Sequence, residues 1–335
     1  MLFLVAAEDP ARIRERAGVV ANQLAGDEYL EYGKTLGDLT RGSGVRLASV
    51  EGTGHVDIVR SPGAVAEVVG WLDAIYGVER AAAAPVVDAR LEALGLGFLA
   101  LLLVMPGIGG LVGRLSPHVA ERPASGAFGR LAIFGAVLLF TLPLVALGEP
   151  GVLLGLAVAD GVVAQFFYAG VILLAGLALG NRLGLAARVG RWNLAVAAAV
   201  VGMLAIYALL TPLGVAFHRM SLTPERALLG LLAALALFPF TLASNSLLRR
   251  GSAWVATLTV LLGRALLVVV LGIGIAMEIV PGVVALMLPM LAGFFVFFEL
   301  VGVPVYVGSR NVVTVALLEA LWLAWIFAAI LPVRL

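Results

Sequence analysis

Eight runs of about 20 or more mostly apolar residues follow one another from residue 94 almost to the C-terminus. A helix needs about 20 apolar residues to cross the hydrocarbon core of a bilayer, because each residue advances it by about 1.5 Å. The runs therefore exclude a soluble fold for this part of the chain and predict an α-helical polytopic membrane protein. The expected spans are residues 94–114, 130–148, 152–179, 193–216, 226–247, 253–277, 283–307 and 312–332.

The third run is long and contains a polar interruption, Ala159-Asp160-Gly161. Glycine weakens the interior of a helix, and a span longer than the bilayer is thick must tilt or break. We therefore expect a tilted or broken helix over residues 152–179.

The first 92 residues have a different composition from the rest. They carry 14 acidic and 9 basic side chains, a net charge of −5, whereas the remaining residues carry 7 acidic and 13 basic, a net charge of +6. We expect a small α/β piece at residues 1–80, a connector at 81–93 and a membrane domain at 94–335.

Several kinds of site have no support in the sequence. The chain has no cysteine, which excludes disulfides, thiolate zinc sites and a cysteine nucleophile. It has no paired histidines, no Walker loop and no GxGxxG motif, so we predict no metal and no cofactor. Nucleic-acid binding is disfavoured, because the soluble piece is acidic and the basic residues lie at membrane edges.

The N-terminal piece shows two apolar runs that each end in polar residues. Residues 2–7 predict a buried strand that ends at Glu8-Asp9-Pro10, where Asp9 is a candidate helix cap. Residues 45–50 predict a second strand that ends in Glu51-Gly52-Thr53-Gly54-His55. Residues 62–76 carry an apolar stripe at helical spacing, and we expect a further short helix over residues 27–39.

This order of elements resembles the final third of an α/β-hydrolase sheet. In that family the acid of a Ser/Asp/His triad follows one late strand and the histidine follows the next. The resemblance implies that Asp9 is the acid and His55 the base. A buried carboxylate would orient the imidazole, which takes the proton of a serine hydroxyl. Alternatively, Asp9 is only a structural cap and His55 a solvated loop residue; Asp57 is a second candidate acid.

The chain departs from that family at the nucleophile. No G-x-S-x-G motif is present, and Ser43 and Ser125 lack the strand-to-helix context of a nucleophile. We expect the serine to lie upstream of Met1, in a longer protein that also carries an export signal. Alternatively, the piece is a remnant that another chain completes.

Arginine is unevenly distributed between the two sets of loops that connect the expected spans. Positive residues are retained on the cytoplasmic side, so the arginine-rich set predicts that side. The N-terminal piece and the C-terminus are then extracytoplasmic, and we expect the plasma membrane. One set of loops holds Arg114, Arg122, Arg130, Arg182, Arg188, Arg191, Arg249, Arg250 and Arg310; the other holds Arg219, Arg226 and Arg334.

Among the ionisable residues of the expected spans, those away from the span ends are the informative ones: Asp160, Arg264, Glu299 and Glu319. Such residues are costly in lipid and mark ion pairs or functional sites. The depths of Arg264, Glu299 and Glu319 agree within about 6 Å at 1.5 Å per residue, so Arg264 is expected to pair with one or both glutamates. A structural ion pair is one interpretation; two carboxylates for one cation leave a proton or ion relay as another.

The sequence thus favours a membrane-anchored serine α/β-hydrolase that acts on an ester, a peptide or another acyl substrate. A transport or signalling protein with a degenerate hydrolase-like module is the alternative, and an inactive gene fragment is a third. The predicted partners are the lipid bilayer and an acyl or ester substrate. The sequence predicts no particular oligomeric state.

Overall fold

The structure is a computed structural model that describes residues 1–26, 28–55, 57–79, 90–120, 126–148, 160–180, 192–215 and 222–330. The chain forms two compact units, Met1–Ala93 and Leu94–Leu335, which we name the N-terminal unit and the membrane unit. Of the expected connector at 81–93, residues 81–89 lie outside the described residues, and the first membrane helix begins at Arg90.

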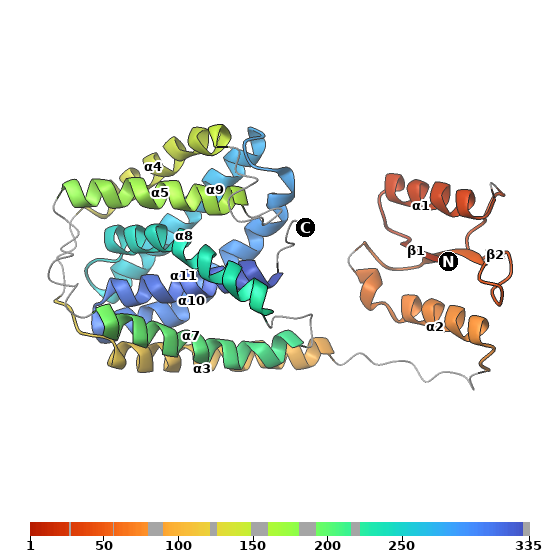
Figure 1. Cartoon of the computed structure of the whole chain (residues 1–335), viewed down its shortest axis with the longest axis horizontal. Coiled ribbons are helices and arrows are strands. Elements are labelled where there is room, and N and C mark those ends of the chain that lie inside the picture. Colours follow the sequence, from red (N-terminus) through yellow and green to blue (C-terminus); the bar gives the residue numbers. More distant parts are fainter. Residues whose placement is uncertain are drawn as a thin grey trace. The chain divides into compact units, whose positions relative to one another are not determined.

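The N-terminal unit contains a small sheet with a helix on each face (Figure 1). The strand order is β1-β3-β2, in which β1 runs parallel to β3 and β2 runs antiparallel to it. Two adjacent parallel strands need a crossover connection, which here contains α1. The elements are β1 (Leu2–Ala6), α1 (Ala11–Leu24), β2 (Thr35–Leu36), β3 (Val45–Val50), the 3-10 helix η1 (Asp57–Arg60) and α2 (Pro62–Tyr76).

The helix expected over residues 27–39 is wrong. Residues 28–39 form turns around the short strand β2, and Asp27 lies outside the described residues. Gly33 and Gly37 adopt φ angles of 83° and 80°, which are incompatible with a right-handed helix. At Gly37 a Cβ atom would also lie 2.5 Å from the carbonyl oxygen of Ser43, so this tight turn requires glycine.

The core of the N-terminal unit is small. Ala21 of α1, Leu30, and Val45 and Leu47 of β3 form its buried cluster. Strand β1 is apolar throughout, yet it lies at the edge of the sheet. Apolar sequence of this kind is typical of strands with a neighbour on both sides.

The prediction of eight membrane spans is confirmed: the described residues include eight helices that are long and apolar enough to cross a membrane. The third helix begins at Asp160, and residues 152–159 of that expected span lie outside the described residues. A 3-10 helix, η3 (Gly282–Met287), precedes α10. The helices are α3 (Arg90–Leu115), α4 (Ala127–Leu147), α5 (Asp160–Leu179), α7 (Trp192–Val215), α8 (Pro224–Leu248), α9 (Ala253–Ala276), α10 (Leu288–Ser309) and α11 (Val312–Ile330).

Helices α8 and α11 occupy the middle of the membrane unit, between α5 and α7 (Figure 1). Small residues let the helix backbones approach closely, as is common between membrane helices. A Cβ atom on Gly170 of α5, for example, would lie 2.3 Å from the backbone nitrogen of Phe240 in α8. Large apolar side chains such as Leu103 and Leu235 point outward, where a bilayer would surround them.

Candidate functional site

Asp9 and His55 meet at one edge of the sheet in the N-terminal unit. Asp9 follows β1 and His55 follows β3, and the carboxyl ends of parallel strands lie at the same edge. The Oδ1 atom of Asp9 lies 2.7 Å from Nδ1 of His55. The two residues are 46 positions apart in the sequence, so the parallel pairing of the two strands brings them together.

Backbone hydrogen bonds fix the two loops that carry this pair. The amide of Ala7 donates to the carbonyl of Val50 (3.0 Å), and the amide of Glu8 donates to the carbonyl of Thr53 (3.2 Å). The hydroxyl of Thr53 donates back to the carbonyl of Val50 at 2.7 Å. The loop after β3 is thus tied to the loop after β1 directly beside Asp9 and His55.

Asp9 is held in place by its second carboxylate oxygen, which accepts the amide of Ala6 at 3.0 Å. The prediction that Asp9 caps the following helix is wrong: Pro10 occupies that position, and no side chain bonds to the first turn of α1. Proline has no side-chain oxygen that could accept an amide of the first turn. The carboxylate of Asp9 is therefore directed to β1 and to His55.

The two members of the pair differ in exposure: the side chain of Asp9 is 3% exposed and that of His55 is 64% exposed. A neutral imidazole that donates from Nδ1 to a carboxylate carries its lone pair on Nε2. His55 can then accept a proton from a group that approaches Nε2, while Asp9 fixes the tautomer. Asp57, the other candidate acid, begins η1 and is not a hydrogen-bond partner of His55 among the described contacts.

In the part of the chain that the structure describes, no serine hydroxyl forms a hydrogen bond with His55. Ser43 belongs to an exposed turn in which its hydroxyl accepts the amide of Asp38 and donates to the Asp38 carbonyl. The hydroxyl of Thr40 donates to the carboxylate of Asp38 and holds the pKa of Asp38 below its ordinary value. Ser125 lies outside the described residues.

A second group of charged residues lies inside the membrane unit and links four helices. The Nη2 atom of Arg264 (α9) lies 2.7 Å from Oε1 of Glu319 (α11). The other oxygen of Glu319 accepts from Asn245 (α8) at 2.7 Å, and Asn245 in turn accepts from Nε of Arg249 at 2.9 Å. Arg249 then pairs with Glu299 (α10) at 2.5 Å. We name these five residues the buried polar chain.

Arg264 thus contacts one of the two expected glutamates, Glu319, whereas Glu299 contacts Arg249. Arg249 follows the end of α8, in the loop where it was expected, but its side chain extends back into the bundle and is almost fully buried. A spacing of four residues places Asn245 and Arg249 on one helix face. That spacing is the sequence signal that would have identified Arg249.

The buried polar chain is enclosed by aromatic rings, and several of its polar atoms have no hydrogen-bond partner among the described residues. The guanidinium carbon of Arg264 lies 4.9 Å from the ring centre of Phe295 and 5.1 Å from that of Phe240. Oε2 of Glu299 is buried and has no hydrogen-bond partner among the described residues. Two arginines and two glutamates balance in charge, so the chain of contacts brings no net charge into the bundle.

Asp160, the fourth intramembrane residue singled out by sequence, belongs to the first turn of α5 and is buried. One turn later, Gln165 donates to the carbonyl of Leu138 and to the hydroxyl of Thr141, both at 2.8 Å, and so links α5 to α4.

Comparison of the chain with models of protein families, with curated proteins and with solved structures found no match.

Proposed function

We propose that this protein is a membrane-bound serine hydrolase of the α/β type, acting on an ester, a peptide or another acyl substrate. Asp9 orients His55, and His55 is the general base. The observation that carries the proposal is the 2.7 Å contact between Asp9 and Nδ1 of His55, which leaves the other edge of an exposed imidazole available. In a hydrolytic triad that edge takes the proton of the serine hydroxyl.

The surrounding fold supports the proposal. Two adjacent parallel strands, joined through a helix and covered by helices on both faces, resemble the end of an α/β-hydrolase sheet. The acid follows the earlier strand and the base follows the later one, in the order that this family uses. A cap or a surface histidine would need no such contact between two strand ends.

The serine nucleophile is proposed to come from polypeptide outside these 335 residues, because the sequence has no G-x-S-x-G motif. The sheet has a place for more strands. Strand β1 is apolar and lies at the sheet edge, and its outer edge pairs with no strand among the described residues. An added strand beside β1 would cover an edge that is otherwise prone to aggregate.

The proposed location is the plasma membrane, with the N-terminal unit and the C-terminus on the extracytoplasmic side. Nine arginines in or beside one set of loops and three in or beside the other support this orientation; of these, Arg114, Arg130 and Arg226 lie in terminal turns of helices. Of these arginines, the ones that lie outside the described residues are Arg122, Arg182, Arg188, Arg191, Arg219 and Arg334.

The test compares His55→Ala with His118→Ala in the protein isolated from its native membranes. His118 is an exposed histidine of the membrane unit and serves as the matched control. We expect His55→Ala to lower the hydrolysis of a p-nitrophenyl ester by at least about 10³-fold, because the hydroxyl loses its base. His118→Ala should leave the rate unchanged. Full activity in His55→Ala would contradict the assignment.

The intact mass of the same preparation locates the nucleophile. A product heavier than the 34.7 kDa of these 335 residues, labelled by a fluorophosphonate in its additional part, is the expected result. A product of 34.7 kDa that neither hydrolyses esters nor reacts with the probe contradicts the proposal and favours a second candidate function.

That second candidate is a transport protein in which the N-terminal unit is a non-catalytic module. It is favoured by the buried oxygen Oε2 of Glu299, which has no partner among the described residues and could hold a proton. In proteoliposomes loaded with a pH-sensitive dye, Glu299→Gln would then stop proton flux. The exposed residue Glu278 provides the control substitution Glu278→Gln. Equal flux in both variants would exclude the relay.

A further inference from the structure

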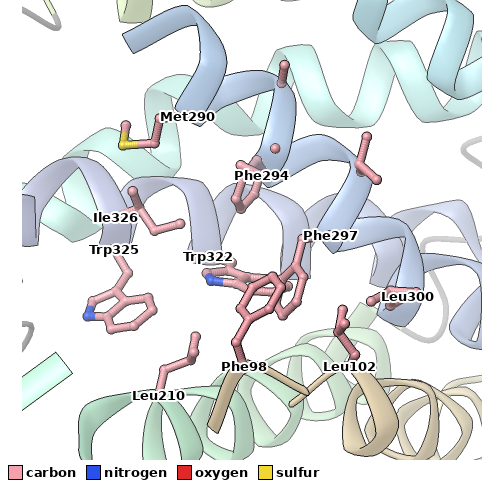
Figure 2. Close-up of a pocket in the computed structure, with 13 residues that line it drawn as sticks. Phe98, Leu102, Leu210, Met290, Phe294, Phe297, Leu300, Trp322, Trp325 and Ile326 are labelled. Atoms are coloured by element: carbon pink, nitrogen blue, oxygen red, sulfur yellow. The ribbon is translucent and has the colours of Figure 1, made fainter. Parts of the chain in front are cut away.

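The membrane unit contains an apolar cavity of about 730 Å³ between α3, α7, α10 and α11 (Figure 2). This volume falls within the range of about 300–1,000 Å³ typical of small-molecule sites. Aromatic rings form much of its wall, and no charged residue lines it. Six of the lining residues are Phe98, Leu210, Met290, Phe297, Trp322 and Trp325.

The cavity lies in one half of the bundle. Its residues come from the first half of α3, the end of α7, residues 290–300 of α10 and the second half of α11. Successive membrane helices alternate in direction, so these four segments lie toward the same end of the bundle. It is the end at which the chain enters α3, whereas Arg249 follows α8 at the opposite end.

The mouth and the floor of the cavity differ in exposure. Phe98 of α3 is 53% exposed, and Val296 of α10 is also exposed, so the mouth lies among side chains that would face the bilayer. Trp322 forms part of the floor and is only 2% exposed. Its ring packs edge-on against Phe294 and Phe297, at centroid distances of 5.4 and 5.7 Å. An apolar chain that enters from the bilayer therefore meets a rigid aromatic wall.

We propose that this cavity binds the hydrocarbon chain of a lipid ester, and that long-chain esters of this kind are the substrates of the proposed hydrolase. A hydrocarbon chain is the expected occupant for two reasons. The mouth opens among residues that would face the hydrocarbon of the bilayer, and no charged residue lines the wall. A hydrocarbon chain that moves from the bilayer into the cavity passes from one apolar medium to another and gains little free energy from the transfer. Its preference for the cavity therefore comes from packing against the aromatic rings. The substrate class rests on the proposed function, whereas chain binding does not.

Gly293 gives a way to close the cavity. It lines the cavity, and a Cβ atom built on it would meet no heavy atom within 4 Å. The side chain of Gly293→Phe therefore starts in open space and adds a ring at the cavity. Gly272 of α9 has equally open space and does not line the cavity, so Gly272→Phe is the matched control.

Binding is measured by tryptophan fluorescence in vesicles of phosphatidylcholine with dibrominated acyl chains, which quench on contact. With Trp71, Trp192 and Trp254 replaced by Phe, emission comes from Trp322 and Trp325, both of which line the cavity. Because bulk lipid does not reach these buried rings, quenching requires a chain inside the cavity. We expect strong quenching that falls at least threefold in Gly293→Phe and is unchanged in Gly272→Phe.

Two further variants keep the binding test decisive. Phe98→Ala widens the mouth and should increase quenching, so the result does not depend on one bulky substitution. In a chain that keeps only Trp254, which is exposed, quenching by bulk lipid should be the same with and without Gly293→Phe. Absent quenching, or quenching unaffected by Gly293→Phe, overturns the proposal. So does cross-linking between copies through cysteines placed at Phe98 and Val296, because a second copy would then cover the mouth.

The link to hydrolysis is tested in the complete protein with esters of short and long acyl chains. We expect Gly293→Phe to lower the ratio of long-chain to short-chain kcat/KM at least tenfold, and Gly272→Phe to leave this ratio unchanged. His55→Ala should remove both activities. Quenching without a change in the ratio overturns the substrate assignment alone, whereas quenching without any hydrolysis overturns the proposed hydrolase and leaves chain binding intact.

Discussion

Each unit of the chain holds a carboxylate 2.7 Å from a nitrogen of a basic side chain: Asp9 with His55 in the N-terminal unit, and Glu319 with Arg264 in the membrane unit. The distances are equal but the surroundings are not. The side chain of His55 is 64% exposed, whereas those of Arg264 and Glu319 are 3% and 1% exposed. A proton acceptor needs access to its reactant, so only the first pair has the exposure that catalysis requires.

Burial also decides what each pair contributes to stability. Removing one member of a buried ion pair leaves an uncompensated charge in a medium that solvates it poorly. An exposed imidazole remains solvated by water when its partner changes. We therefore expect substitutions of the first pair to change activity and substitutions of the second to change stability.

The largest expected effect is that of Asp9→Asn on hydrolysis by the complete protein. The amide preserves the shape of the carboxylate but no longer favours the tautomer with its lone pair on Nε2 of His55. Loss of the carboxylate in a triad costs about 10⁴-fold in kcat. Asp57→Asn is the control, because Asp57 is an exposed carboxylate two residues after His55. A rate close to that of the unmodified protein in Asp9→Asn would reduce the pair to a structural contact.

The second effect concerns Glu319→Gln, measured by thermal unfolding in detergent. The substitution keeps the shape of the side chain and leaves Arg264 without a counter-ion, which costs about 3–5 kcal/mol for a buried pair. Arg264→Met in the same chain should recover part of this loss, because it removes the unpaired charge. If Glu319→Gln melts at the temperature of the unmodified protein, or if the second substitution adds to the loss, the pair does not hold the helices together.

The sequence predicted these two regions with unequal success. The eight spans were predictable because each must supply about 20 apolar residues on its own. Asp9 and His55 were predictable because each lies in the turn that follows a largely apolar strand. The part that Arg249 plays in the buried polar chain was not predictable, because the side chain of an arginine after a span usually lies in the loop. Here it extends back to Asn245 and Glu299. Contacts between helices distant in sequence leave no periodicity to read.

The same limit explains the error at residues 27–39. A helix was expected there because the 46 positions between Asp9 and His55 exceed what one helix needs, but the glycines at 33 and 37 and the pairing of Thr35 with Arg46 determine the backbone. A two-residue strand exists only because β3 is already in place beside it, so its tertiary neighbour overrides local propensity.

The smallest expected effect tests whether burial or hydrogen-bond geometry determines how much an ion pair contributes to stability. It involves the contact between Arg46 of β3 and Glu67 of α2. Arg46 donates to both oxygens of Glu67, at 3.0 and 3.3 Å, and also to the carbonyl of Gly33. The two side chains are 23% and 33% exposed, so water competes for both charges. Exposed pairs contribute about 0.2–1 kcal/mol, and we expect Arg46→Met to lose a similar amount, measured as faster hydrogen exchange in the amides of β3.

Arg41→Met is the control for that measurement, since the pair of Arg41 with Asp38 is more exposed still and should contribute less. The outcome decides what the comparison between the units means. Arg46 forms more hydrogen bonds with its carboxylate partner than Arg264 does, so geometry alone predicts a larger loss for Arg46→Met than for Glu319→Gln. A loss several-fold smaller shows that exclusion of water distinguishes the two units. Losses of equal size would show instead that burial adds nothing, and the exposure of His55 would then carry less weight as a mark of a catalytic base.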